Sequence, residues 1–157
     1  MRYNVTEYAN SQLYGLPVAV IDFETTGVDP HLCRAVEMAI VHLELGKANP
    51  EVVYKSRFNP GIPIPEGASD IHGIRDEDVA NEPFFGDAIE EINVLLEGRV
   101  LAAYNLPFDW TVLNCEYRRS GRWHPTERQR LDMGHQFFGL CGLVMAREVD
   151  NYSRGRG

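Results

Sequence analysis

The stretch VAVIDFETTG, residues 18–27, combines a short apolar run with two acids near its end. The run lies between Pro17 and a Thr-Thr-Gly turn, a pattern typical of a central strand that is covered on both faces. Because side chains alternate across a strand, Asp22 and Glu24 would share one face while Phe23 points to the other. Two carboxylates on one face of a covered sheet need basic partners, protons or a metal ion.

The residues that adjoin this acid pair include no Lys or Arg, so a divalent cation is a natural counter-charge. Magnesium and manganese prefer oxygen ligands, which a carboxylate pair at a strand end can supply. A plain salt-bridged surface pair is the alternative. A third acid, Asp109, lies early in a helix expected directly after a strand, so its carboxylate can face the same end of the sheet. Asp109 could equally be a first-turn acid that the helix dipole favours.

The whole chain is consistent with one soluble domain, since it has 157 residues and 44% hydrophobic composition. Residues 35–46 and 51–60 are expected to form antiparallel strands joined by a hairpin beside the first strand. Residues 61–74 carry repeated Pro and Gly and are expected to form an ordered loop. Apolar residues at helical spacing predict a helix within 76–98, and residues 99–105 predict a further strand.

The next helix is expected over residues 105–121, with Asn105 as its cap and Pro107 in its first turn. Residues 128–149 are expected to begin as a short strand and to continue as a largely apolar helix. The polar, glycine-containing tail 151–157 is expected to be flexible.

Composition narrows the classes of function. A net charge of -8 argues against a general nucleic-acid coat, because affinity for phosphates comes mainly from clustered Lys and Arg. One basic cluster, residues 118–130 around Trp123, is interpreted as a solvated helix end rather than a nucleic-acid contact. The cysteines, Cys33, Cys115 and Cys141, lack metal-binding spacing and are expected to be buried thiols. No segment resembles a signal peptide or a membrane span, so a cytoplasmic location is expected.

Four segments, which follow one another along the chain in the same order as in the family, resemble the DEDD family of 3'-to-5' exonucleases, which includes the proofreading epsilon subunit of bacterial replicative polymerase. VIDFETTG, residues 20–27, resembles the first motif of the family, and NLPFDWTVL, residues 105–113, resembles the second. IHGIRDEDV, residues 71–79, is similar to the family segment between these motifs. RLDMGHQF, residues 130–137, is similar to the strand that follows the second motif.

The resemblance implies an RNase H-like α/β fold. Its mixed sheet has three antiparallel strands first and later strands parallel to the first, with flanking helices. The resemblance also implies two divalent cations, Mg or Mn, which stabilise the attacking water and the leaving 3' oxygen during phosphodiester hydrolysis. Asp22 would bridge both metals, Glu24 would hold the metal with the nucleophilic water, and Asp109 would support the second. The implied partners are 3' ends of single-stranded DNA or RNA, with a DNA polymerase as a candidate.

The resemblance further implies a pocket for the terminal nucleotide of the substrate. The residues carried over to this pocket are Thr25, Thr26, Gly27, His72, Gly73, Asn105 and Phe108. Without the resemblance, His72 would be interpreted as a turn residue whose ring is satisfied by backbone groups.

The third motif of the family, His-x-x-x-x-Asp, is missing from this sequence. After Asp132 the only acids are Glu148 and Asp150, and neither His124 nor His135 precedes an acid at the required spacing.

We therefore expect residues 1–157 to form a single exonuclease-like domain that is truncated at its C-terminal end. We also expect this chain alone to be nearly inactive, because a general base typically contributes ~100- to 10,000-fold. A non-catalytic module that binds nucleic-acid ends or a polymerase is the alternative. The choice between DNA and RNA and the oligomeric state stay open.

Overall fold

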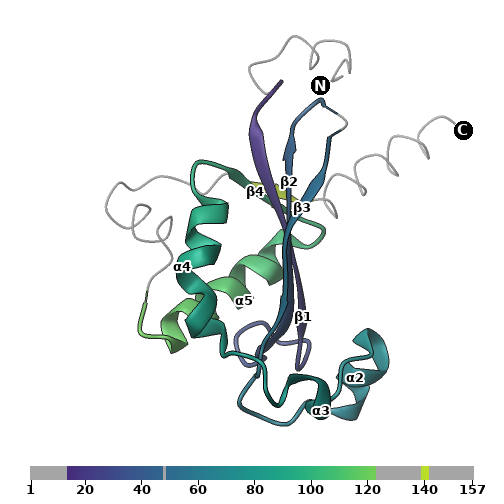
Figure 1. Ribbon diagram of the computed structural model, residues 1–157. Coiled ribbons are helices and arrows are strands. Elements are labelled where there is room, and N and C mark those ends of the chain that lie inside the picture. Colours follow the sequence, from purple (N-terminus) through teal and green to yellow (C-terminus); the bar gives the residue numbers. More distant parts are fainter. Residues whose placement is uncertain (1–13, 48, 123–138, 142–157) are drawn as a thin grey trace, which may run out of the picture.

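The computed structural model describes residues 14–47, 49–122 and 139–141, which form a mixed α/β structure around one sheet (Figure 1). The sheet has five strands in the order β3-β2-β1-β4-β5. The strand predicted from the opening stretch is β1 (Pro17–Thr25), and it lies in the middle of the sheet.

The strand directions confirm the expected mixed sheet. β1 pairs antiparallel with β2 (Ala35–Glu44), and β2 pairs antiparallel with β3 (Glu51–Arg57). β4 (Val100–Ala103) runs parallel to β1, and β5 (Gly139–Cys141) runs parallel to β4. The first three strands are thus antiparallel and the later ones are parallel to the first, as expected.

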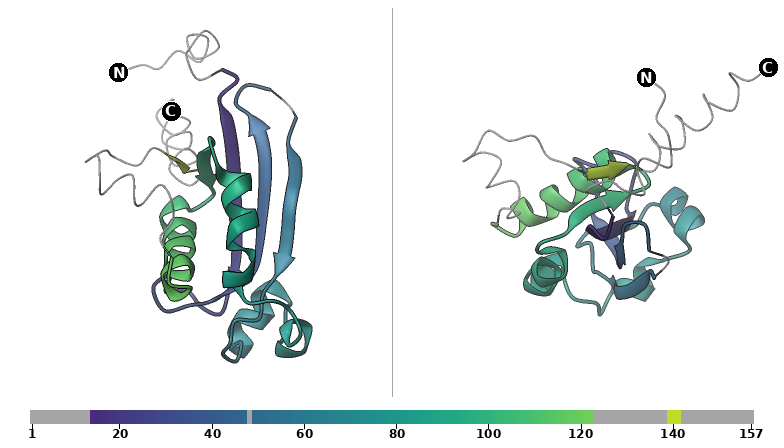
Figure 2. Two further views of the ribbon diagram at one scale, coloured as in Figure 1. Left: turned by 60° about the vertical axis from the view of Figure 1, so that its left-hand side comes forward. Right: turned by 90° about the horizontal axis from the view of Figure 1, so that it is seen from above.

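Two long helices, α4 (Phe85–Leu96) and α5 (Leu106–Arg119), lie next to each other on one face of the sheet (Figures 1 and 2). Their apolar sides pack against the strands to form the main core. Phe23 points into this core, where its side chain is 7% exposed and its ring centroid lies 6.1 Å from that of Phe85. The core also contains the fully buried side chains Ile21, Met38, Ile40, Phe58, Ile89, Ile92, Leu113 and Tyr117.

The segment expected as an ordered loop, residues 61–74, contains a helix, so that expectation was wrong. α2 (Glu66–His72) begins directly after Pro65 and ends at Gly73, and α3 (Asp76–Val79) follows. The Pro and the Gly mark the two ends of a short helix, because Pro suits a helix start and Gly suits a left-handed C-cap. α2 and α3 lie near the sheet end at which β1 finishes (Figure 1).

The last predicted elements are reproduced in part. α5 begins after Asn105 with Pro107 in its first turn, but the Asn105 side chain makes no capping hydrogen bond. β5 occupies residues 139–141, where an apolar helix was expected, because pairing with β4 overrides the local pattern. The rest of the segment 128–149 and the tail 151–157 lie outside the described residues.

The cysteines and the basic cluster lie partly within the described residues. Cys33 is buried and Cys115 is half-buried, and both thiols are free. In the basic cluster, Arg119 and Arg122 form ion pairs with acids on α5 and α4, and the residues from Trp123 onward to 138 lie outside the described part. Among the described residues, no helix has the length and apolar character needed to span a membrane.

Candidate active site

Three carboxylates approach one another near the end of β1, and they are called the carboxylate site below. Asp22 and Glu24 come from β1 and are exposed and half-buried, respectively. Asp109 comes from the first turn of α5 and is only 5% exposed. Its carboxylate accepts a hydrogen bond of 3.2 Å from the backbone N–H of Phe23, the residue between the two β1 acids. α5 therefore delivers the third acid directly to the strand that carries the first two.

Two of the three acids, Asp109 and Glu24, have raised pKa values. Burial, and then the negative charge of Asp22, raise the pKa of Asp109 to about 7, although the Phe23 N–H acts in the opposite direction. Burial, and then Asp22, also raise the pKa of Glu24 above its ordinary value. The site therefore resists carrying three negative charges at once unless a positive charge is added.

A nearby acid outside the carboxylate site, Glu37, is paired with basic side chains. Glu37 on β2 lies opposite Glu24 in the antiparallel register. Glu37 forms ion pairs with Lys55 at 3.2 Å and with Arg57 at 3.3 Å. In the described part of the chain, no Lys or Arg forms an ion pair with any acid of the carboxylate site. The structure thus does not support the alternative of a plain salt-bridged surface pair.

The donor chemistry of the carboxylate site fits a divalent cation, because carboxylate oxygens are the ligands that Mg²⁺ and Mn²⁺ prefer. Across residues 14–47, 49–122 and 139–141, however, no three His, Cys, Asp or Glu side chains form a preformed group around one ion. These observations are compatible, since Mg²⁺ commonly binds one or two carboxylates and completes its shell with water and phosphate oxygens.

The turn that follows β1, residues 25–27, is held by its own hydrogen bonds. The Thr25 hydroxyl donates to the carbonyl of Gly27 at 2.7 Å. Thr26 is 5% exposed, and its N–H donates to the carbonyl of Arg34 at 3.0 Å. The Thr26 hydroxyl in turn accepts from the Arg34 N–H at 3.0 Å. The Thr26 side chain therefore serves the shape of this turn, which we call the 25–27 turn.

The end of α2 brings His72 into the electrostatic range of Glu24, whose pKa a positive charge on His72 would lower. The Nδ1 atom of His72 accepts a hydrogen bond of 3.1 Å from the N–H of Ile74. In a neutral ring the proton then lies on Nε2, a buried atom with no hydrogen-bond partner among the described residues. Backbone groups thus satisfy one side of the ring, as the simpler interpretation expected, and the other side keeps a free donor.

The remaining predicted pocket residues differ in their placement. Gly73 follows His72 and adopts a left-handed φ of 76°, which explains the need for Gly. Phe108 is half-buried and packs against the main core, whereas Asn105 is exposed at the start of α5. The third-motif candidates, His124 and His135, lie outside the described residues.

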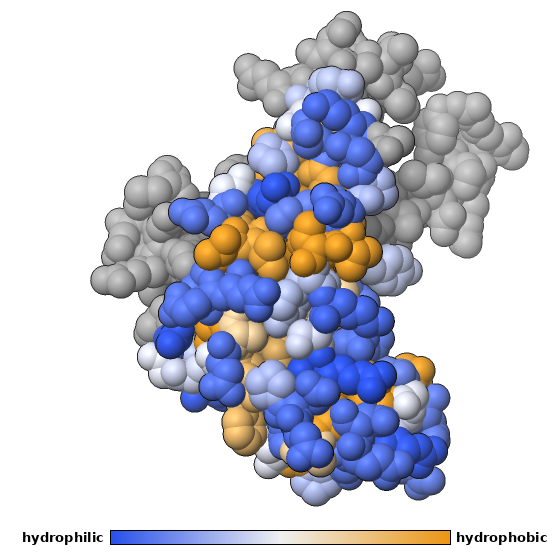
Figure 3. Space-filling model, in the orientation of Figure 1, coloured by the Kyte–Doolittle hydropathy of each residue, from blue (hydrophilic) through white to orange (hydrophobic). Residues whose placement is uncertain are grey.

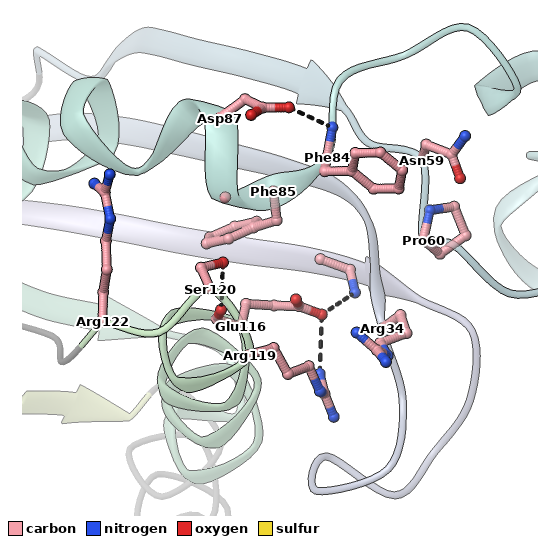
Figure 4. A pocket seen from close by; sticks show the side chains of 12 residues that line it. Arg34, Asn59, Pro60, Phe84, Phe85, Asp87, Glu116, Arg119, Ser120 and Arg122 are labelled. Carbon is pink, nitrogen blue, oxygen red and sulfur yellow. Dashed lines mark hydrogen bonds and ion pairs between the residues drawn. The ribbon is translucent and has the colours of Figure 1, made fainter.

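A further buried acid, Glu116, which no sequence motif marks, is 5% exposed near the end of α5. Glu116 accepts hydrogen bonds from the N–H of Ala35 at 2.9 Å and from Nη1 of Arg119 at 3.0 Å (Figure 4). It borders a cavity of about 400 Å³ between the start of α4 and the end of α5. The sequence signal for Glu116 is its spacing from Asp109, because residues seven apart lie on one helix face.

Two relatives have related sequences over part of their length. A DNA polymerase III subunit epsilon-like protein from Rhodobacter capsulatus is 35% identical over 102 residues, which cover 64% of this chain and 14% of that protein. A 3'-5' exonuclease DinG from Bacillus subtilis is 32% identical over 103 residues, which cover 65% of this chain and 11% of that protein. The chain thus spans only a small part of the curated relatives that it matches.

A solved structure supports the fold, and a family model identifies the family. E. coli exonuclease I in complex with a dT13 oligonucleotide matches with a TM-score of 0.60 at 21% identity, covering 71% of this chain and 25% of that one. A likeness at this identity supports the RNase H-like fold alone. The model of the family described as exonuclease (RNase_T) matches residues 19–153, which is most of the chain. The chain therefore belongs to this exonuclease family.

Proposed function

We propose that the carboxylate site hydrolyses the terminal phosphodiester bond at the 3' end of a DNA strand, with two divalent cations, Mg or Mn. The observation that carries this proposal is the meeting of three acids without a basic ion-pair partner among the described residues. Placing acids together in a partly buried site is unfavourable unless a cation balances them.

Asp22, Glu24 and Asp109 would hold the cations. Bound divalent cations supply Lewis-acid stabilisation of the developing charge on the phosphate and lower the pKa of water. Asp22 influences the pKa values of both other acids, which supports a role for Asp22 in bridging. Asp109 must lose its proton before it can bind a cation, and the Phe23 N–H orients its carboxylate for this.

The 25–27 turn and His72 would receive the terminal nucleotide, with Gly73, Asn105 and Phe108 around them. Support for His72 comes from its buried Nε2 atom, since a free N–H donor beside a carboxylate site suits a phosphate oxygen. Because the chain has a net charge of -8, broad electrostatic binding of nucleic acid is disfavoured, and we expect the contacts with the substrate to be confined to the end of β1. The choice of DNA over RNA, and a polymerase as partner, rest only on the names of the relatives.

The test is a single-turnover assay of a 5'-labelled single-stranded DNA with the 157-residue chain in molar excess and Mn²⁺ present. We expect a ladder of products that shorten from the 3' end over long incubations, because a missing general base slows cleavage by ~100- to 10,000-fold. The Asp22→Ala variant should show no ladder, and Asp70→Ala, an exposed acid on α2, should match the native chain. Equal cleavage by Asp22→Ala would contradict the assignment of the site.

A non-catalytic module is the second candidate, and the missing His-x-x-x-x-Asp motif favours it. Such a module would bind the labelled strand without shortening it, and Asp22→Ala would leave this binding unchanged. The same assay, read together with a binding titration, distinguishes the two functions.

A further inference from the structure

We propose that Glu116 and Arg119 are positioning residues that hold the 25–27 turn in the shape needed to receive the terminal nucleotide. This inference rests on the proposed function, because the turn matters for activity only if it binds the substrate. Both residues lie at the end of α5, away from the carboxylate site at its start.

The bonds of Glu116 reach the first residue of β2. β1 and β2 pair regularly as far as Glu24, after which the register shifts so that Thr25 lies opposite Ala35. Such an irregularity interrupts the ladder and leaves a backbone group in need of another partner. Glu116 accepts the Ala35 N–H at 2.9 Å, so a side chain from α5 replaces the missing ladder bond. The strand end is thereby tied to the helix.

Arg119 adds a second attachment to the same loop. One nitrogen, Nη1, donates to Glu116 at 3.0 Å, and the other, Nη2, donates to the carbonyl of His31 at 2.9 Å. The guanidinium thus bridges the buried acid and the middle of the loop between β1 and β2. A planar guanidinium can satisfy both acceptors at once, whereas the ammonium of Lys is a point charge without this fork.

These attachments bracket the predicted nucleotide-binding residues. Ala35 follows Arg34 directly, and Arg34 exchanges two hydrogen bonds of 3.0 Å with Thr26. The loop that leaves the 25–27 turn is therefore fixed at His31 and at Ala35, and Thr26 is bonded to the residue between them. Loss of the Glu116 and Arg119 contacts would release the loop and, with it, the turn.

Asp109 and Glu116 lie seven residues apart on one face of α5, but they differ in the charges around them. Asp109 and Glu116 each accept a backbone N–H from the sheet, at Phe23 and at Ala35. Glu116 also has the guanidinium of Arg119 as a counter-charge, as Figure 4 shows, whereas Asp109 has no ion pair within the described part. Asp109 is therefore left to bind a cation, while the charge of Glu116 is already balanced.

The first experiment measures amide hydrogen exchange in the full chain for the native protein and for Glu116→Ala, Glu116→Gln and Arg119→Lys. We expect exchange at Thr26 and Arg34 to be faster by roughly tenfold or more in Glu116→Ala, because a buried hydrogen-bond partner is lost. Glu116→Gln keeps an acceptor for Ala35 and should stay closer to the native rates. The control is Glu90→Gln. This variant removes an exposed acid of α4 that forms an ion pair with Arg122.

Amide hydrogen exchange in the core of α4 serves as the measure of global stability, because a variant that is merely less stable would exchange faster there as well. Faster exchange at Thr26 and Arg34, with native rates at the buried Ile89, supports positioning. Unchanged exchange rates at Thr26 and Arg34, or an equal acceleration at Ile89, would overturn it. If Glu116→Ala does not fold, Arg119→Lys gives the same comparison at smaller amplitude, because Lys lacks the fork that bonds both Glu116 and His31.

The second experiment titrates thymidine 5'-monophosphate with excess Mg²⁺ and follows the amide shifts of the 25–27 turn. We expect roughly tenfold weaker nucleotide binding in Glu116→Ala, near-native binding in Glu116→Gln, and unchanged Mg²⁺ affinity in both. Weakening of Mg²⁺ and nucleotide binding together would mean general damage and would overturn the positioning role. No shift at all in the native chain would count against the proposed function, while the exchange data would still decide how Glu116 acts on the turn.

Discussion

The raised pKa of Asp109 makes a specific prediction about stability and pH. In the metal-free protein, this carboxyl titrates at about 7 instead of its ordinary 3.8, chiefly because it is buried and lies beside Asp22. Between these two pH values the folded chain holds a proton that the unfolded chain has lost. Raising the pH through this window therefore removes stability, and the full cost is present above pH ~7.

The Asp109→Asn variant should escape this cost, because its side chain is neutral at every pH. The rise in pKa from 3.8 to about 7 corresponds to roughly 4 kcal/mol of disfavour for the ionised carboxylate. The Asn side chain keeps an oxygen that can accept the Phe23 N–H. We expect the variant to exceed the native chain in free energy of unfolding by roughly 2 to 4 kcal/mol at pH 8, and by less than about half as much at pH 5, which lies early in this window.

Urea unfolding at pH 5 and pH 8, with a chelator to remove metal ions, measures this difference. Asp70→Asn is the matched control, because Asp70 is an exposed acid on α2 and its neutralisation should have little effect at either pH. A stability difference between Asp109→Asn and the native chain that does not grow with pH would refute the reasoning. So would a variant that is less stable than the native chain at pH 8.

Substitutions at three further positions test the structure around the site. Phe23→Ala should lower the free energy of unfolding by ~3 to 5 kcal/mol, because a buried ring in contact with Phe85 is lost, and a loss below ~1 kcal/mol in urea unfolding would be inconsistent with this core. Gly73→Ala should cost ~1 to 2 kcal/mol from its left-handed φ of 76° alone, since an added Cβ would meet no atom within 4 Å. Gly73→Asn should cost less, and equal thermal shifts for the two variants would contradict this explanation. Lys55→Ala should cost at most ~1 kcal/mol, because the Lys55 side chain is 63% exposed and Glu37 keeps its second ion pair with Arg57, and a larger loss in the same assay would show that the pair is not a simple surface contact.

The elements nearest the site could be predicted from local patterns. The apolar run of β1 and its acids at alternate positions predicted both the strand and the inward direction of Phe23. The Pro in its first turn and the apolar spacing predicted α5, although Asn105 does not cap the helix with its side chain. Each of these features depends on residues that are close together in the sequence, so a short segment is enough to predict it.

The features that the sequence did not predict depend on contacts between distant segments. α2 was interpreted as loop because Pro65 and Gly73 punctuate the segment, and only the fold shows them as helix ends. The pKa of Asp109 depends on burial by elements far away in the sequence. Glu116 has no local feature that marks it, and its bond to the Ala35 N–H depends on the register shift between β1 and β2 and on how α5 packs against that strand end.

The most direct test of the central claim is a calorimetric titration of Mn²⁺ into the 157-residue chain and its Asp22→Ala and Asp109→Asn variants at pH 8. If the carboxylate site holds divalent cations, the native chain should bind Mn²⁺ and both variants should bind it at least roughly tenfold more weakly, because each loses a charged ligand. Native affinity in Asp22→Ala, or no binding to the native chain, would contradict the claim that these three acids form a metal site.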